Sequence, residues 1–188
     1  MKPVQIERYG NEDVVEIAEV DQPKPGAGQV LVKVKAAAVN PVDWKIRDGL
    51  GDLFGLKPPL ILGCEVAGTV EAVGENVKDF APGDDIYGYL GAHTGGYAEY
   101  VAAPASEFVR KPKQIDFDTA ASVPVAALTA WQGIFDHGKL ASGQRILITG
   151  ASGAVGSMAV QLAKVTGAHV IGIGSGPERG VCAWPRGR

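Results

Sequence analysis

Short runs of alternating apolar and polar residues fill the first hundred positions of the chain. The runs at 4–6, 14–17, 30–36, 65–73, 85–89 and 97–102 predict β-strands. Between the third and fourth runs, the pair Asn40-Pro41 predicts the cap and first turn of a short helix ending near Arg47. Several short strands separated by glycine-rich turns are typical of a small β-barrel-like domain.

The pattern becomes helical in the second half of the chain. Residues 116–131 predict two helical segments divided by Pro124. The apolar run at 146–148 then predicts a buried parallel strand, the apolar positions between 155 and 165 predict a helix with one buried stripe, and 168–173 predict a second strand. This order of elements predicts one βαβ unit.

A glycine-rich turn joins the first strand of this unit to its helix. Gly153 would let the backbone approach a pyrophosphate, and Gly156 would let the helix pack closely against its strand. Unpaired N–H groups and the helix dipole favour an anion there. The GxGxxG pattern is weak alone, since Ala151 replaces its first glycine, but its context predicts nucleotide binding. The expected contacts with the cofactor are Ala151, Ser152, Gly153, Ala154, Val155 and Gly156.

Composition and charge narrow the possible functions. The chain has 188 residues, of which 46% are hydrophobic and 21% charged, as in soluble globular proteins of one or two domains. The net charge of −3 gives no electrostatic reason to expect a nucleic acid or an anionic membrane as partner. No uncharged apolar run approaches the roughly 18 residues of a membrane span. With two cysteines and no apolar signal core, a cytoplasmic location is expected.

Five segments together resemble the medium-chain dehydrogenase/reductase superfamily, and within it the zinc-free quinone oxidoreductases. They read NPVDWKIRDG at 40–49, PLILGCEVAGTVEAVG at 59–74, GGYAEYV at 95–101, AASVPVAALTAW at 120–131 and RILITGASGAVGSMAVQLAK at 145–164. The resemblance implies an α/β protein with a GroES-like β-barrel catalytic domain at 1–122 and an incomplete Rossmann nucleotide-binding domain at 123–173. Residues 174–188 show no helix or strand period and are expected to form an irregular tail.

The resemblance also implies an activity and two further site residues. The activity is NAD(P)H-dependent hydride transfer to a quinone or an α,β-unsaturated carbonyl, a small-molecule substrate, in a family that forms homodimers. The resemblance places Asn40 beside the nicotinamide and substrate, as the candidate catalytic residue, and the hydroxyl of Thr129 near the nicotinamide. A helix cap for Asn40 and helix packing for Thr129 are the alternatives. Asp43 suits a first-turn acid better than a catalytic group, and His93 is expected to be exposed.

The residues that bind zinc in alcohol dehydrogenases are replaced in this chain. Those enzymes carry a cysteine where this chain has Asn40 and a histidine where it has Cys64. A zinc site needs three protein ligands with suitable donors, which Cys64 and Glu65 alone do not supply. We therefore expect no bound metal, and a zinc-type alcohol dehydrogenase is the less favoured alternative.

The choice of cofactor depends on the end of the second strand. Sites for NAD usually carry an acidic residue about 20 residues after the glycine turn, where it binds the ribose 2′-hydroxyl. Here residues 172–176 contain no acid, and Ser175 could donate a hydrogen bond to a 2′-phosphate. NADPH is therefore expected in preference to NADH.

The resembled family continues well beyond the position that matches residue 173. We therefore expect a truncated chain, and a catalytically inactive fragment is the alternative function. The strand at 146–148 would have one uncovered edge, which predicts association or poor solubility with little turnover. The composition of the last 15 residues predicts a disordered tail.

Overall fold

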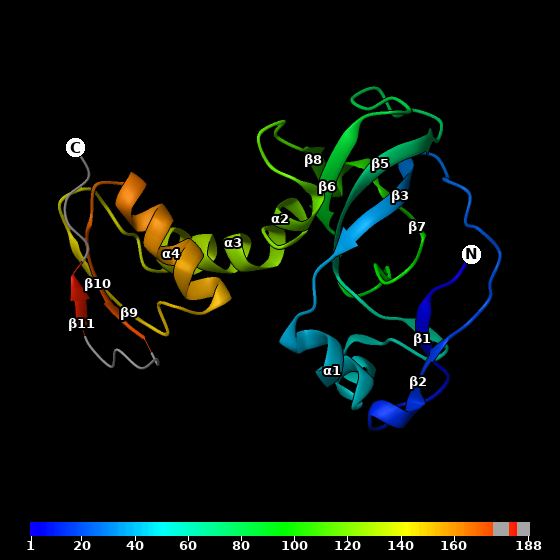
Figure 1. Cartoon of the computed structure of the whole chain (residues 1–188), viewed down its shortest axis with the longest axis horizontal. Helices are drawn as coiled ribbons and strands as arrows, with labels where there is room; N and C mark the ends of the chain where they lie inside the picture. Colours follow the sequence, from blue (N-terminus) through cyan, green and yellow to red (C-terminus); the bar gives the residue numbers. More distant parts are fainter. Residues whose placement is uncertain (175–180, 184–188) are drawn as a thin grey trace. The chain divides into compact units, whose positions relative to one another are not determined.

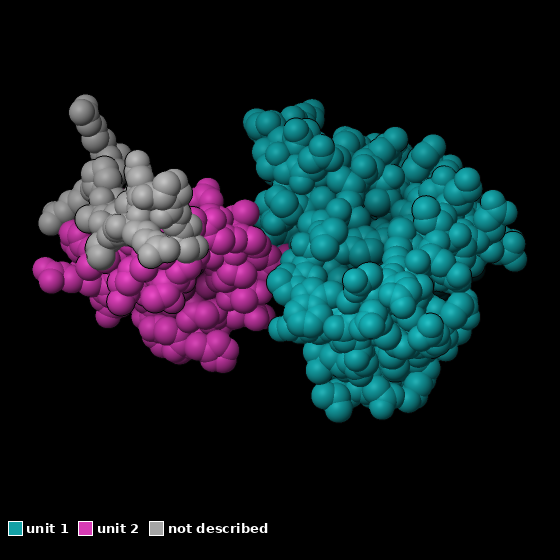
Figure 2. Space-filling model, turned by 60° about the horizontal axis from the view of Figure 1, so that its bottom comes forward, with its two compact units in different colours: residues 1–124 teal, residues 125–188 magenta. Residues whose placement is uncertain are grey.

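The computed structural model of this chain describes residues 1–174 and 181–183, and it divides the chain into two units. The first unit is Met1–Pro124 and the second is Val125–Arg188, coloured teal and magenta in Figure 2. The division falls two residues beyond the boundary expected from the sequence.

The first unit is built on a sheet of five antiparallel strands in the order β7-β3-β5-β6-β8 (Figure 1). Side chains alternate between the two faces of each strand. Buried valines pack together in one apolar core, among them Val30, Val32, Val66 and Val70. The strands of this sheet are β3 (Gln29–Ala37), β5 (Glu65–Val73), β6 (Asp85–Tyr89), β7 (Tyr100–Pro104) and β8 (Phe108–Arg110).

A smaller three-stranded sheet in the order β2-β1-β4 completes the strands of this unit. It contains β1 (Val4–Ile6), β2 (Val15–Ile17) and β4 (Leu60–Ile61), and the short 3₁₀ helices are η1 (Glu12–Val14), η2 (Leu50–Phe54) and η3 (Ala105–Glu107). Helix α1 (Pro41–Arg47) is anchored here, because its Ile46 packs with Ile6 and Leu62 in a second core. Helix α2 (Phe117–Ala121) packs on β5 through Ala120 and Ala121.

The second unit contains the predicted βαβ arrangement. Helix α3 (Pro124–Trp131) leads into a π-helical segment, η4 (Gln132–His137). Strands β9 (Arg145–Thr149) and β10 (His169–Ile173) pair in parallel, and α4 (Ala154–Val165) connects them. Ile148, Ala159, Ala163 and Val170 lie in the core between helix and strands. The α/β class and the predicted βαβ unit are thereby confirmed.

A strand within the last residues corrects the expectation of an irregular tail over 174–188. Strand β11 (Val181–Ala183) pairs antiparallel with β10, with Val181 opposite Ile173. Backbone N–H and C=O groups at the edge of β10 can accept such a partner without any side-chain period. Residues 175–180 and 184–188, including the candidate Ser175, lie outside the described residues, and so does the disorder expected there.

Strand β7 begins later than its alternating pattern predicts. The backbone N–H of Tyr97 donates to the carbonyl oxygen of Leu62, and Ala98 bridges to Pro3, so these residues leave the five-stranded sheet. Strand β8 was not predicted from the sequence, because three residues are too few to show the alternation of a strand. None of the helices in the described part of the chain combines the length and apolar character needed to cross a bilayer.

Two glycines of the larger sheet lie where segments approach closely. A Cβ atom at Gly68 in β5 would lie 2.3 Å from the carbonyl oxygen of Lys33, and one at Gly88 in β6 would lie 2.1 Å from that of Glu107. Neither position has room for a side chain.

Candidate cofactor and substrate site

The glycine-rich turn connects the end of β9 to the start of α4. Gly150 turns the chain with a φ of +69°. The backbone N–H of Ala151 donates to the carbonyl oxygen of Ile173 at 2.9 Å, which ties the turn to the end of β10. Helix α4 begins after Gly153, and the first N–H groups of any helix have no acceptor inside it. These groups and the helix dipole form a site suited to a phosphate.

Two glycines keep this turn compact. A Cβ atom at Gly156 would lie 2.0 Å from the carbonyl oxygen of Gly150, so the helix packs directly on the turn. A Cβ atom at Gly153 would lie 3.3 Å from the same oxygen. Ala151 is buried, whereas Ser152, Gly153, Ala154 and Val155 are exposed, so the turn offers its backbone to a ligand. The six expected cofactor contacts therefore lie together in one turn.

The end of β10 lies against this turn. A Cβ atom at Gly174 would lie 3.3 Å from Oγ of Ser152. The hydroxyl of Ser152 thus lies at the end of the strand, where NAD-binding proteins usually carry a carboxylate. From the sequence, Ser152 was expected only as part of the phosphate turn, because its proximity to Gly174 depends on how the turn folds back on the strand.

Asn40 precedes α1 and forms its N-terminal cap. Its backbone N–H donates to Oδ2 of Asp43 at 2.6 Å, and the two residues form a capping box with Pro41 at the first helical position. The cap considered for Asn40 and the first-turn acid considered for Asp43 are both present.

The side chain of Asn40 is fixed from a second direction by the start of β5. Its Nδ2 donates to Oε1 of Glu65 at 2.7 Å and lies 3.7 Å from Sγ of Cys64. Glu65 is only 1% exposed, so this hydrogen bond is shielded from water. Asn40 itself is half-buried and therefore within reach of a ligand.

Asp43 connects this cluster to the loop before β7. The hydroxyl of Tyr97 donates to Oδ2 of Asp43 at 2.6 Å, while the other carboxylate oxygen, Oδ1, is buried without a hydrogen-bond partner. Burial and the carboxylate of Asp43 hold the pKa of Tyr97 well above its usual value, so the phenol stays protonated and donates. Asp43 and Tyr97 therefore support the helix that carries Asn40.

Cys64 is buried in the same cluster, 3% exposed. Its burial, and then the carboxylates of Asp43 and Glu65, raise the pKa of the thiol to about 12. A carboxamide is a poor zinc ligand, since zinc takes thiolate, imidazole or carboxylate. Among the described residues, no group of three or more His, Cys, Asp or Glu side chains is arranged to hold a metal ion. The donor set around Cys64 does not fit a zinc site.

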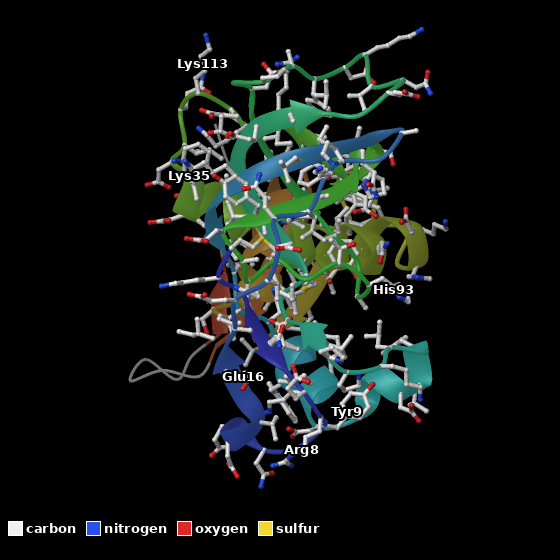
Figure 3. All side chains as sticks on the ribbon, turned by 90° about the vertical axis from the view of Figure 1, so that its right-hand side faces the viewer. Arg8, Tyr9, Glu16, Lys35, His93 and Lys113 are labelled. Atoms are coloured by element: carbon white, nitrogen blue, oxygen red, sulfur yellow. The ribbon has the colours of Figure 1, made fainter. Side chains whose placement is uncertain are left out.

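The other candidate residues are not among the hydrogen-bond partners of Asn40 described above. The hydroxyl of Thr129 donates to the carbonyl oxygen of Val125 at 2.7 Å, one turn back in α3, which is the helix-packing alternative. His93 is exposed on a glycine-rich loop and lies at the periphery of the view in Figure 3. Trp44, on α1, is 50% exposed.

Comparison with known proteins places this architecture in a family. The alcohol dehydrogenase GroES-like domain matches residues 26–113. A quinone-oxidoreductase homologue of spinach (Spinacia oleracea) chloroplasts is 43% identical over 178 residues, which cover 90% of this chain and 54% of the spinach protein. Over the aligned residues, the chain is similar to the quinone oxidoreductase branch of the medium-chain dehydrogenase/reductase superfamily.

Solved structures also resemble this chain, over most of its length. An alcohol dehydrogenase superfamily protein of Novosphingobium aromaticivorans has a TM-score of 0.88 at 34% identity, covering 94% of this chain and 54% of that one. A mycobacterial protein determined in complex with NADPH has a TM-score of 0.83 at 31% identity, covering 95% of this chain and 54% of that one. The chain spans about half the length of the relatives it matches.

Proposed function

We propose that this chain is the NADPH-binding part of a reductase that transfers hydride to a quinone or an α,β-unsaturated carbonyl without zinc. The observation that carries the proposal is the turn at 150–156, whose exposed backbone opens on the N-terminus of α4 beside a strand end without an acid. The relative determined with NADPH supports the same cofactor.

Each group of residues has a part in this proposal. The turn from Ala151 to Gly156 binds the pyrophosphate through the backbone N–H groups at the start of α4, because those of Ala151 and Gly153 already donate to the carbonyl oxygens of Ile173 and Gly150. Ser152, together with Ser175, donates to the 2′-phosphate of the ribose. Asn40 and Thr129 contact the nicotinamide. The cofactor, when bound, supplies the hydride, and the protein contributes orientation and exclusion of water.

The absence of zinc is part of the same proposal. It is supported by Asn40, which offers a carboxamide in place of a thiolate. Zinc at one equivalent per chain after purification without chelators would contradict it. We further propose a small-molecule substrate, a cytoplasmic location and a homodimer as in the family. The net charge of −3 is in line with the proposal that neither a nucleic acid nor a membrane is a partner.

Cofactor preference tests the proposal directly. In fluorescence titrations NADPH should bind more tightly than NADH. Gly174→Asp should weaken NADPH by about tenfold or more, because a carboxylate beside Ser152 would repel the 2′-phosphate. Gly133→Asp is the matched control, since it adds the same charge to the second unit at a position with free space around its Cβ.

Two outcomes would contradict the proposed cofactor site. One is NADH binding as tightly as NADPH in the parent chain. The other is an equal loss of NADPH affinity in both aspartate variants. Reduction of a simple benzoquinone by NADPH tests the catalytic part, and NADPH binding without turnover would instead identify the chain as an inactive binding module.

A further inference from the structure

The carboxamide of Asn40 has a defined orientation. Its amide nitrogen faces two buried groups at the start of β5 and directly before it. These are Oε1 of Glu65 at 2.7 Å and Sγ of Cys64 at 3.7 Å. Both hydrogens of the amide nitrogen are therefore directed into the protein. The carbonyl oxygen Oδ1 takes part in the capping box and keeps a second lone pair, because an amide oxygen accepts two hydrogen bonds.

The carboxylate of Glu65 decides this orientation. Oε1 of Glu65 accepts the hydrogen bond from the amide nitrogen at 2.7 Å, and an oxygen that accepts favours the amide nitrogen over the oxygen of Asn40. A rotated Asn40 would place its oxygen against Oε1 of Glu65, and two acceptors would then meet beside a side chain that is only 1% exposed. The thiol of Cys64 is the weaker of the two partners.

We infer that Glu65 is a positioning residue, which holds Asn40 so that it offers Oδ1, and not an N–H group, to the ligand. Resting on the proposed function, this inference determines which ligand group Asn40 binds. The partner of Oδ1 must be a hydrogen-bond donor, either the carboxamide N–H of the nicotinamide or a hydroxyl of the reduced substrate. Asn40 consequently does not donate to the oxyanion that forms during reduction.

The orientation of Asn40 can be measured without cofactor. In ¹⁵N-labelled protein, Asn40→Ala assigns the side-chain amide signals of Asn40. These N–H groups should exchange slowly with water in the parent chain and about tenfold faster or more in Glu65→Gln, since a hydrogen bond to a charged group is lost. Glu107→Gln, which changes a partly buried carboxyl elsewhere in the same unit, should leave them unchanged.

Glu65→Asp provides a second variant that keeps the charge but shortens the side chain away from Asn40. It should also speed the exchange of the Asn40 amide, and it keeps the test open if Glu65→Gln does not fold. Asn40 signals that exchange at the parent rate in a folded Glu65 variant would overturn the inference.

A ligand comparison identifies the donor that meets Oδ1. The 3-acetylpyridine analogue of NADPH lacks the carboxamide N–H, so the parent should bind NADPH about fivefold or more tightly than the analogue. This ratio should approach one in Asn40→Ala and in Glu65→Gln, and the double variant should show no further loss. Additive losses would overturn the inference, because they would mean that Glu65 acts independently of Asn40.

A ratio near one in the parent would assign Oδ1 to the substrate hydroxyl, provided that hydroquinone binding then weakens in Asn40→Ala and Glu65→Gln alike. No effect on either ligand would overturn the inference. If NADPH does not bind at all while the Asn40 amide still responds to Glu65→Gln, the proposed function fails and the positioning of Asn40 by Glu65 stands.

Discussion

At the scale of single residues, the first unit places two buried carboxylates, a buried thiol and a partly buried phenol next to Asn40, which is proposed to contact the nicotinamide. Asp43 and Glu65 are 4% and 1% exposed, and each accepts a hydrogen bond from Asn40. Buried carboxylates are costly unless neighbouring donors compensate for the lost water. Burial raises the pKa of Cys64 and of Tyr97, which couples the stability of the first unit to the protonation of these two residues.

The thiol of Cys64 should make the first unit sensitive to alkali. Its pKa is about 12 in the folded chain, above the usual value of 9.0. Below pH 9 both folded and unfolded chains keep this proton. As pH rises from 9 towards 12, the unfolded chain releases the proton first, so the free energy of unfolding falls. The slope for one group cannot exceed about 1.4 kcal/mol per pH unit.

Urea unfolding at a series of pH values above 8 would measure this effect. Cys64→Ala should lose stability less steeply with pH than the parent chain. Val66→Ala, a neighbouring buried truncation without a titrating group, should keep the parent's slope although it is also less stable. Equal slopes in the parent and Cys64→Ala would show that the thiol does not carry the linkage.

How much of the site could be predicted depended on sequence distance. The turn that includes Gly153 and Gly156 could be predicted because strand, turn and helix follow one another directly. The contact between Asn40 and Glu65 joins residues 25 apart in the chain, and no local pattern contains it. Ser152 meets Gly174 only because the turn is tied back to β10, which again is a tertiary feature.

At the scale of elements, long periodic segments were predicted best. The bounds of α1, α4, β5 and β6 agree with those expected, because caps, turns and periodicity mark their ends. Strands β8 and β11, each of three residues, depend on a partner strand for their existence and leave no period. The π-helical segment η4 also lacks a sequence signal, because its residues suit an ordinary helix equally well.

Strand β9 is the element that favours association. Within the described residues it pairs with β10 alone, and Leu147 is 59% exposed. An apolar strand with a free edge can pair with another chain, so the purified chain should associate. Leu147→Lys should shift light-scattering masses towards the monomer.

Val165→Lys is the control for this prediction, because Val165 is 89% exposed but lies at the end of α4 rather than on β9. It should leave the association unchanged. A parent chain that remains monomeric at high concentration, or two lysine variants with the same effect, would contradict a role for the β9 edge.

At the scale of the whole molecule, apolar burial is divided between the two units. The core around Val32 and Ile86 uses only residues of 1–124, and the core around Ile148 and Val170 uses only residues of 125–188. Each unit therefore has an apolar core of its own.

Residues 1–124 should accordingly fold when expressed alone. Their amide signals in a ¹H–¹⁵N spectrum should overlay on those of the same residues in the full chain, apart from the last turn. The spectrum of the full chain provides the reference. A collapsed spectrum typical of an unfolded chain would show that the first unit needs the second.

The crowding at Gly68 and Gly88 has a consequence for the gene. Every amino acid other than glycine carries a Cβ atom, and at these positions it would lie 2.3 or 2.1 Å from a backbone oxygen. A backbone oxygen cannot rotate away as a side chain can, so every missense change in either codon requires a neighbouring backbone segment, β3 or η3, to move. A valine in the same sheet can mutate to another apolar residue at modest cost. No amino-acid substitution at either glycine is therefore expected to be neutral, and only synonymous changes should accumulate in the two codons.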